Sequence, residues 1–127
     1  MMEKRSAIFV WVATLLMFST QAFGHHGIKT YRTDHLISLK GTVTDIEFVN
    51  PHVRIHLEVK EPNGESEIWT IEVAPRSMLY KVGWNKTTLK PKDPIVVTGY
   101  QAKDGSKLLT VRRIVLPNGQ DLNQNPK

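Results

Sequence analysis

Histidines gather at two places in this 127-residue chain, and imidazole nitrogen is the commonest side-chain ligand of metal ions in proteins. His25 and His26 are adjacent. His52 and His56 lie four positions apart, which on a strand puts their Cα atoms about 13 Å from each other. Two ligands of one ion must lie much closer, so a metal site needs a nitrogen from another part of the chain.

The first 24 residues have the three parts of a secretory signal peptide. A basic start is followed by an uncharged apolar run from Ala7 to Phe18 and by small residues. The run is shorter than the roughly 20 residues of a membrane-spanning helix. We therefore expect residues 1–24 to be removed, leaving a periplasmic protein with no stable membrane anchor. Two cuts satisfy the small-residue rule, one after Gly24 and one after Ala22.

Either cut would create a terminus suited to copper, since copper(II) prefers imidazole and amine nitrogens in a square-planar set. After the first cut, His25 would offer its α-amine and its ring, with a third nitrogen from His26, His35 or His52. After the second cut, His25 would stand third, where the terminal amine, two amides and the imidazole can surround one ion. The predicted metal ligands are therefore His25, His26 and His52. The alternative is a polar arm whose histidines lie near the cut by chance.

The chain after this arm is patterned mainly for β-strands. Residues 53–59 and 66–73 alternate apolar and polar side chains, with an Asn63-Gly64 hairpin turn between them. Apolar positions spaced three and four apart predict a short helix over residues 75–83. Further strands are expected at residues 36–49, with a bulge or bend near Gly41, and at residues 94–101 and 107–116.

This order predicts a mostly β fold, a small five-stranded OB-like Greek-key barrel with one short helix between strands three and four. A small open sandwich would have the same order. The expected parts are a signal peptide (1–24), an N-terminal arm (25–35), the barrel (36–118) and a polar tail (119–127). Four aromatic residues are expected in the core: Phe48, Trp69, Tyr80 and Trp84.

Several short motifs follow one another along the chain. They are His25-His26, Asn50-Pro51-His52, Gly83-Trp84, Val96-Val97-Thr98-Gly99-Tyr100 and Lys103-Asp104-Gly105-Ser106. Together they resemble a family of small exported bacterial proteins known only as a domain of unknown function. The resemblance covers nearly the whole mature chain and implies a signal peptide, a His-His pair and one OB-like barrel. It implies no activity. Gly27 and Lys92 depart from the pattern, which has Ser and Gly at these places.

No common catalytic signature occurs in the sequence, neither a nucleophile elbow nor a phosphate loop nor a His-Glu-x-x-His motif, so we expect no enzyme. OB-like barrels bind ligands on the face of strands two and three. Here that face would present Arg54, His56, Glu58 and Thr70. Their mixed charges, with no run of five like charges in the chain, indicate no nucleic acid partner.

Two hypotheses about function follow from the sequence. The first is a non-catalytic periplasmic binding module, whose ligand is a small molecule, an oligosaccharide or an envelope protein. The second is a periplasmic protein that binds copper through the histidine exposed at its new terminus.

Overall fold

The computed structural model describes residues 30–122. The predicted signal peptide, and the His25-His26 pair after it, lie outside the described residues. The elements follow one another as β1 (Tyr31–Glu47), β2 (Arg54–Lys60), β3 (Ser66–Glu72), α1 (Arg76–Lys81), β4 (Pro94–Ala102) and β5 (Leu108–Val115). No helix among residues 30–122 is long and apolar enough to cross a lipid bilayer.

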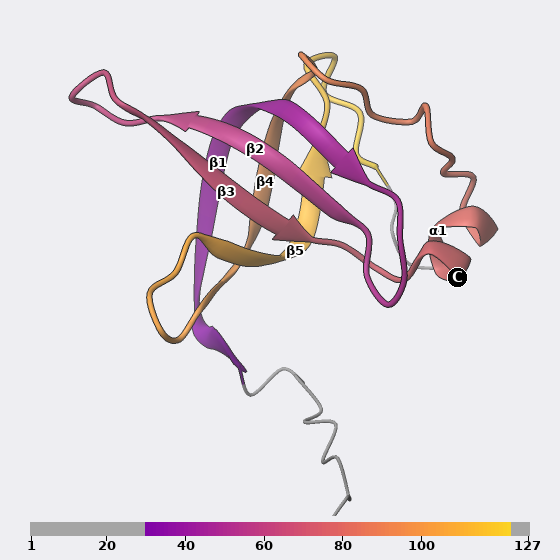
Figure 1. The fold of residues 1–127 in the computed structure, drawn as a ribbon, viewed down its shortest axis with the longest axis horizontal. Coiled ribbons are helices and arrows are strands. Elements are labelled where there is room, and N and C mark those ends of the chain that lie inside the picture. Colours follow the sequence, from indigo (N-terminus) through magenta and orange to yellow (C-terminus); the bar gives the residue numbers. More distant parts are fainter. Residues whose placement is uncertain (1–29, 123–127) are drawn as a thin grey trace, which may run out of the picture.

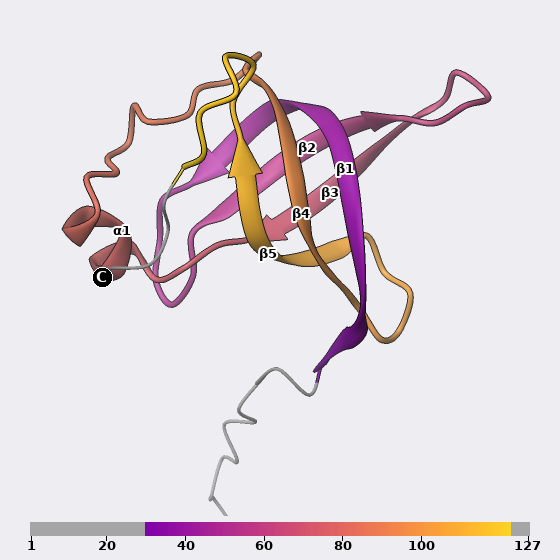
Figure 2. The ribbon, with the colours of Figure 1, turned by 180° about the vertical axis from the view of Figure 1, so that it is seen from behind.

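The five strands close into a barrel in the order β1-β2-β3-β5-β4, with β4 paired to β1 (Figures 1 and 2). Every pair is antiparallel except β3 and β5, which run parallel over Thr70–Glu72 and Leu108–Thr110. The chain therefore follows the OB arrangement, with α1 between β3 and β4. The predicted fold class is confirmed, and the open sandwich is wrong.

β1 pairs with two neighbouring strands because it bends. Its first half pairs with β4 and its second half with β2, and the register with β2 shifts between Val43 and Asp45. The hydroxyl of Thr44, the residue inside the shift, donates to the backbone oxygen of His56 at 3.1 Å. This bulge is the phase change predicted near Gly41, and it turns the strand around the corner of the barrel.

The described fold extends beyond the predicted barrel at both ends. β1 begins at Tyr31, inside the predicted arm, because Tyr31 pairs with Ala102 and is buried. Residues 32–35 are exposed, so hydrophobic patterning gave no sign of this part of the strand. At the other end, Leu122 donates its backbone N–H to Ile114 and packs against the core.

The core fills the barrel and one of its ends. Alternate residues of β2 and β3 point inward, and Ile55, Leu57 and Ile71 have no exposed surface. Leu79 is the one buried residue of α1 and belongs to the same cluster, so α1 covers an end of the barrel. Trp69 and Trp84 are buried as predicted. Tyr80 is not in the core; it is half exposed and packs edge-on against the partly buried Phe48.

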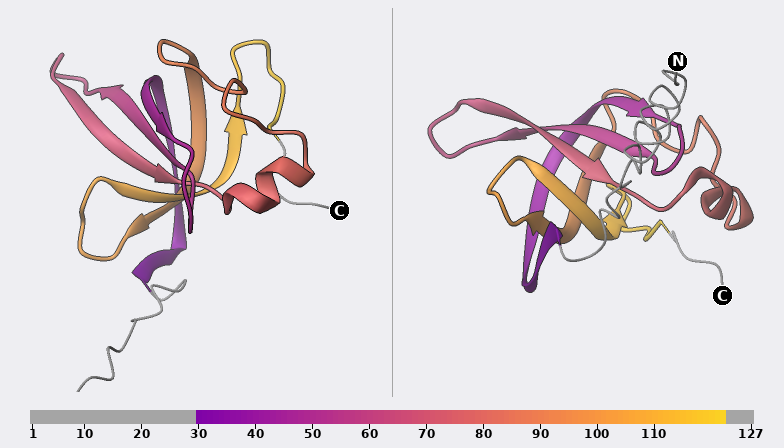
Figure 3. Two further views of the ribbon diagram at one scale, coloured as in Figure 1. Left: turned by 45° about the vertical axis from the view of Figure 1, so that its right-hand side comes forward. Right: turned by 60° about the horizontal axis from the view of Figure 1, so that its bottom comes forward.

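The β2–β3 hairpin and the loop between β4 and β5 extend from the side of the barrel opposite α1 (Figures 1 and 3). They diverge, so that β3 and the start of β5 form a fork. The paired stretch of β3 and β5 covers only three residues on each strand, which leaves this fork open toward the outer surface.

Candidate ligand-binding face

The outward-facing side chains of β2 and β3 form a polar surface, the β2–β3 face. Its members are Arg54, His56, Glu58, Ile68, Thr70 and Glu72. The antiparallel register sets Arg54 opposite Glu72, His56 opposite Thr70, and Glu58 opposite Ile68. Residues directly opposite each other lie on the same side of a sheet. The structure thus brings all four predicted ligand-binding residues to one face.

A carboxylate of β1 connects two of these residues. Glu47 lies 2.6 Å from Nε2 of His56, measured to Oε1, and 3.6 Å from Nη1 of Arg54, measured to Oε2. Because a carboxylate only accepts, Nε2 of His56 carries the proton in this contact. Glu47 was missed in the sequence because its position opposite Arg54 depends on the bulge in β1.

An open hollow of about 490 Å³ lies in the fork between β3 and the β4–β5 loop. Its lining residues are Arg54, Ile68, Thr70, Glu72, Ser106, Lys107 and Leu108. Of the four predicted residues, Arg54 and Thr70 line the hollow, whereas His56 and Glu58 lie beside it. Sequence reasoning missed Ser106 and Lys107. The only sequence signal near them was the Lys103-Asp104-Gly105-Ser106 motif.

Lys107 fixes the position of this loop. Its ammonium lies 2.6 Å from Oε2 of Glu67 and 5.1 Å from the ring centroid of Trp69. The hydrogen bond from Lys107 lowers the pKa of the Glu67 carboxyl. The backbone oxygen of Lys107 also accepts from the N–H of Thr70 at 2.8 Å. These contacts tie the loop to β3, so the wall of the hollow exists before a ligand arrives.

A smaller hollow of about 160 Å³ adjoins the first one and shares Glu72 with it. It is also lined by His52, Thr110 and Arg112. The buried hydroxyl of Tyr31 donates to Oε2 of Glu72. Burial, together with this hydrogen bond, raises the pKa of Tyr31 far above its usual value, so the phenol stays protonated. Glu72 is thereby held between the two hollows.

His52 lies in the loop that precedes β2, not on the strand itself, so the expected strand geometry for the pair with His56 is wrong. Its Nδ1 is 2.9 Å from the backbone oxygen of Val73. A carbonyl oxygen only accepts, so Nδ1 carries the hydrogen and Nε2 of the neutral ring keeps a free lone pair. Among residues 30–122, no three His, Cys, Asp or Glu side chains are grouped so as to hold a metal ion.

Residues 13–110 match a family described as a family of unknown function, DUF6152. The chain belongs to this family. The resemblance found in the sequence, to a family without established activity, is thereby confirmed. Among curated proteins, no match to this DUF6152 chain is found.

Two solved structures are similar to the DUF6152 chain. One is the small single-stranded DNA-binding protein from Streptomyces coelicolor, with 18% identity and a TM-score of 0.48, covering 68% of this chain and 94% of that one. The other is the mitochondrial single-stranded DNA-binding protein Rim1 from S. cerevisiae, with 14% identity and a TM-score of 0.48, covering 72% of this chain and 97% of that one.

The expectation that excluded a nucleic acid partner is corrected by this comparison, because both similar structures are described as single-stranded DNA-binding proteins. The expectation rested on the charges of two strands. It did not include Lys107, which the β4–β5 loop brings to the same hollow as Arg54. What those two proteins bind is a property of theirs, and single-stranded DNA enters below as a ligand to be tested.

Proposed function

We propose that this protein is a periplasmic, non-catalytic OB-like module that binds an oligosaccharide in the hollow of the β2–β3 face. The observation that carries the proposal is the meeting of Arg54, Thr70 and Lys107 in one open, preformed hollow. This is the place where OB-like barrels hold their ligands, between strands two and three and the β4–β5 loop.

The chemistry of the lining supports a ligand rich in hydroxyl groups. Arg54 donates hydrogen bonds, Glu72 accepts them, and the hydroxyls of Thr70 and Ser106 do both. A sugar hydroxyl is itself donor and acceptor, so it pairs with each of these groups. The exposed side chain of Ile68 offers an apolar contact to the C–H face of a sugar ring.

Arg54 is free to exchange its partner for a ligand. Its guanidinium has one long contact, 3.6 Å to Glu47, and both side chains of this pair are more than one third exposed. An exposed ion pair of this kind contributes about 0–1 kcal/mol. Giving it up therefore costs the folded protein little, while a hydrogen bond from a charged group to a ligand is worth roughly 1.5–3 kcal/mol.

We expect Arg54→Ala to weaken oligosaccharide binding at least about tenfold, while the melting temperature stays nearly unchanged. The binding is measured by titrating neutral tetrasaccharides of cellulose, starch and chitin into the ¹⁵N-labelled protein and following backbone amide shifts. Saturable shifts should appear at the start of β5 and along β2 and β3.

Arg32→Ala is the matched control, because Arg32 is an exposed arginine of β1 outside the hollow. It should leave affinity and melting temperature unchanged. The oligosaccharide proposal fails if no tetrasaccharide shifts these amides, or if Arg54→Ala and Arg32→Ala bind alike. Saturation of the same amides by oligothymidine alone would replace the oligosaccharide with single-stranded DNA as the ligand.

Copper binding is the second candidate, and the hydrogen bond of His52 favours it. Histidines that bind metals usually donate their other ring N–H to a carbonyl or carboxylate, which fixes the ring and its tautomer. His52 has this arrangement through Val73, and it lines the smaller hollow beside Glu72. The second candidate adds His25 and His26, which lie outside the described residues, as further ligands of copper.

We expect His25→Ala to abolish tight copper(II) binding by the mature protein, whereas His56→Ala, at a histidine bonded to Glu47, leaves most of it. The affinity is measured by competition with a chelator, and the nitrogen ligands are counted by electron paramagnetic resonance. The signal-peptide cleavage site is determined from the mass of the protein isolated from the periplasm of its host. An uncleaved mass, or an affinity equal to wild type in His25→Ala, would contradict copper binding at the new terminus.

A further inference from the structure

A third hollow, of about 480 Å³, opens where β4 begins and β5 ends; we name it the β4–β5 groove. It is lined by Lys40, Pro94, Ile95, Val96, Val115, Leu116, Pro117 and Gly119. None of these residues belongs to the β2–β3 face or to its two hollows. The groove is therefore a separate site, whose function does not depend on the one proposed above.

The floor of the groove is set by strand register. Val96 of β4 pairs with Lys40 of β1 on one side and with Val115 of β5 on the other. The three side chains form one row across the outer surface of the barrel, with the cation at one end and two valines beside it. The floor is thus apolar, and a single charge stands at its edge.

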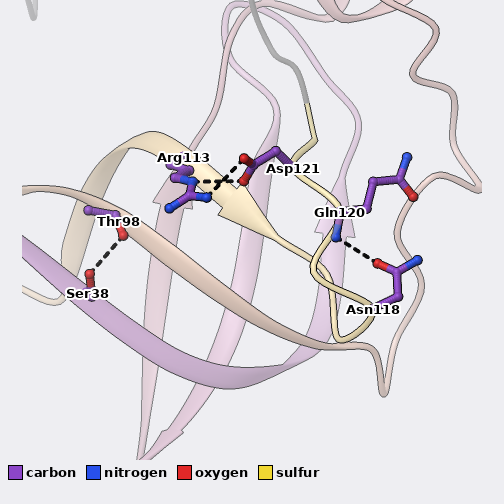
Figure 4. Close-up of polar contacts among 6 residues, drawn as sticks. All are labelled: Ser38, Thr98, Arg113, Asn118, Gln120 and Asp121. Carbon is purple, nitrogen blue, oxygen red and sulfur yellow. Dashed lines mark hydrogen bonds and ion pairs between the residues drawn. The ribbon is translucent and has the colours of Figure 1, made fainter.

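The opposite wall is a turn that is fixed in place (Figure 4). The N–H of Leu116 donates to Gln120 at 2.9 Å, and the N–H of Gln120 donates to Oδ1 of Asn118 at 2.9 Å. Arg113 holds Asp121 by two hydrogen bonds of 2.8 and 3.0 Å. A wall tied at both ends does not have to be ordered by a ligand, which lowers the entropic cost of binding.

Lys40 has no ion-pair partner among residues 30–122. Arg113, the nearby cation on β5, is already paired with Asp121. Lys40 is also the only lining residue of the groove with a polar side chain. A ligand that carried polar groups along its length would leave them unpaired on the two valines, so the lining favours a ligand with one anionic end and an apolar remainder.

We propose that the β4–β5 groove binds a single-chain anionic amphiphile, a medium-chain fatty carboxylate. The carboxylate pairs with the ammonium of Lys40, and the alkyl chain lies over Val96 and Val115 against the wall formed by Leu116 and Pro117. The volume of the groove lies within the range of about 300–1,000 Å³ that small-molecule sites have.

Sodium octanoate, decanoate and dodecanoate, each below its micelle concentration, are titrated into the ¹⁵N-labelled protein. Saturable shifts are expected at residues 94–96 and 115–119. Each added methylene that enters the groove should raise the affinity roughly fourfold. Lys40→Gln should weaken decanoate binding about tenfold, because the carboxylate loses its charged partner.

Lys103→Gln is the matched control, since Lys103 is an exposed lysine that follows β4 at the end away from the groove and does not line it. Decyltrimethylammonium has the same chain with the opposite charge and should bind at least about tenfold more weakly than decanoate. The proposal is overturned if the shifts map elsewhere or do not saturate. It is also overturned if the two charge types bind alike, or if Lys40→Gln matches Lys103→Gln.

Discussion

Gly99→Ala is expected to lower the free energy of unfolding by about 3 kcal/mol. Gly99 pairs with Val111 beside an irregularity of β4, and β5 passes close to its Cα atom. A methyl group there would overlap the backbone oxygen of Thr110 and would lie 2.6 Å from a methyl carbon of Leu109. A backbone atom within a paired strand cannot move aside, so the two strands would have to separate.

The loss is measured by thermal and urea unfolding, and a domain of this size should melt more than about 10 °C below wild type. Thr98→Ala is the neighbouring control. It removes only an exposed hydroxyl, which bonds to Ser38 at 2.8 Å (Figure 4). A wild-type melting temperature in Gly99→Ala would mean that β4 and β5 do not approach each other as closely as described.

Leu79→Ala is expected to destabilise the protein by about 2–5 kcal/mol. α1 has six residues and no side-chain cap at its start, so it has little stability of its own. Leu79 is its one buried side chain and has no exposed surface. Truncation leaves a cavity at the end of the barrel and releases the helix that covers it.

Ser77→Ala controls for the change to alanine at an exposed position of the same helix. The free energy is taken from urea unfolding, and amide hydrogen exchange reports the helix itself. Exchange of the amides of Leu79, Val82 and Trp84 should accelerate in Leu79→Ala only. If the variant unfolds at the urea concentration of wild type, α1 contributes nothing to the barrel.

The strands were predictable because each buries one face. Ile55 and Leu57 alternate with Arg54 and His56 in the sequence. In the structure, Ile55 and Leu57 are buried inside the barrel, and Arg54 and His56 lie on its outer surface. The beginning of β1 was not predictable on this basis. Residues 32–35 are exposed on both faces, and the strand is fixed on either side of them by the pairing of Tyr31 and Leu36 with β4, which lies far along the chain.

Of the residues at the candidate site, too, some were predictable from the sequence and others were not. Arg54 and Thr70 belong to strands joined by one hairpin, so alternation alone put them on a common face. Glu47 needs the bulge in β1, and Lys107 needs the parallel pairing of β3 with β5. Both depend on which strands become neighbours around the ring, and hydrophobic periodicity carries no information about that.

The closure of the ring sets the order in which the chain can fold. Ser38 and Thr98, side by side on β1 and β4, are sixty positions apart in the chain. β5 is inserted between β3 and β4, and it comes last of all. A chain that emerges from its N-terminus can form the β2–β3 hairpin early, but it cannot close the barrel until residues 94–115 are available. Such distant contacts make folding slow, so we expect the barrel to form only after nearly all of its strands are available together.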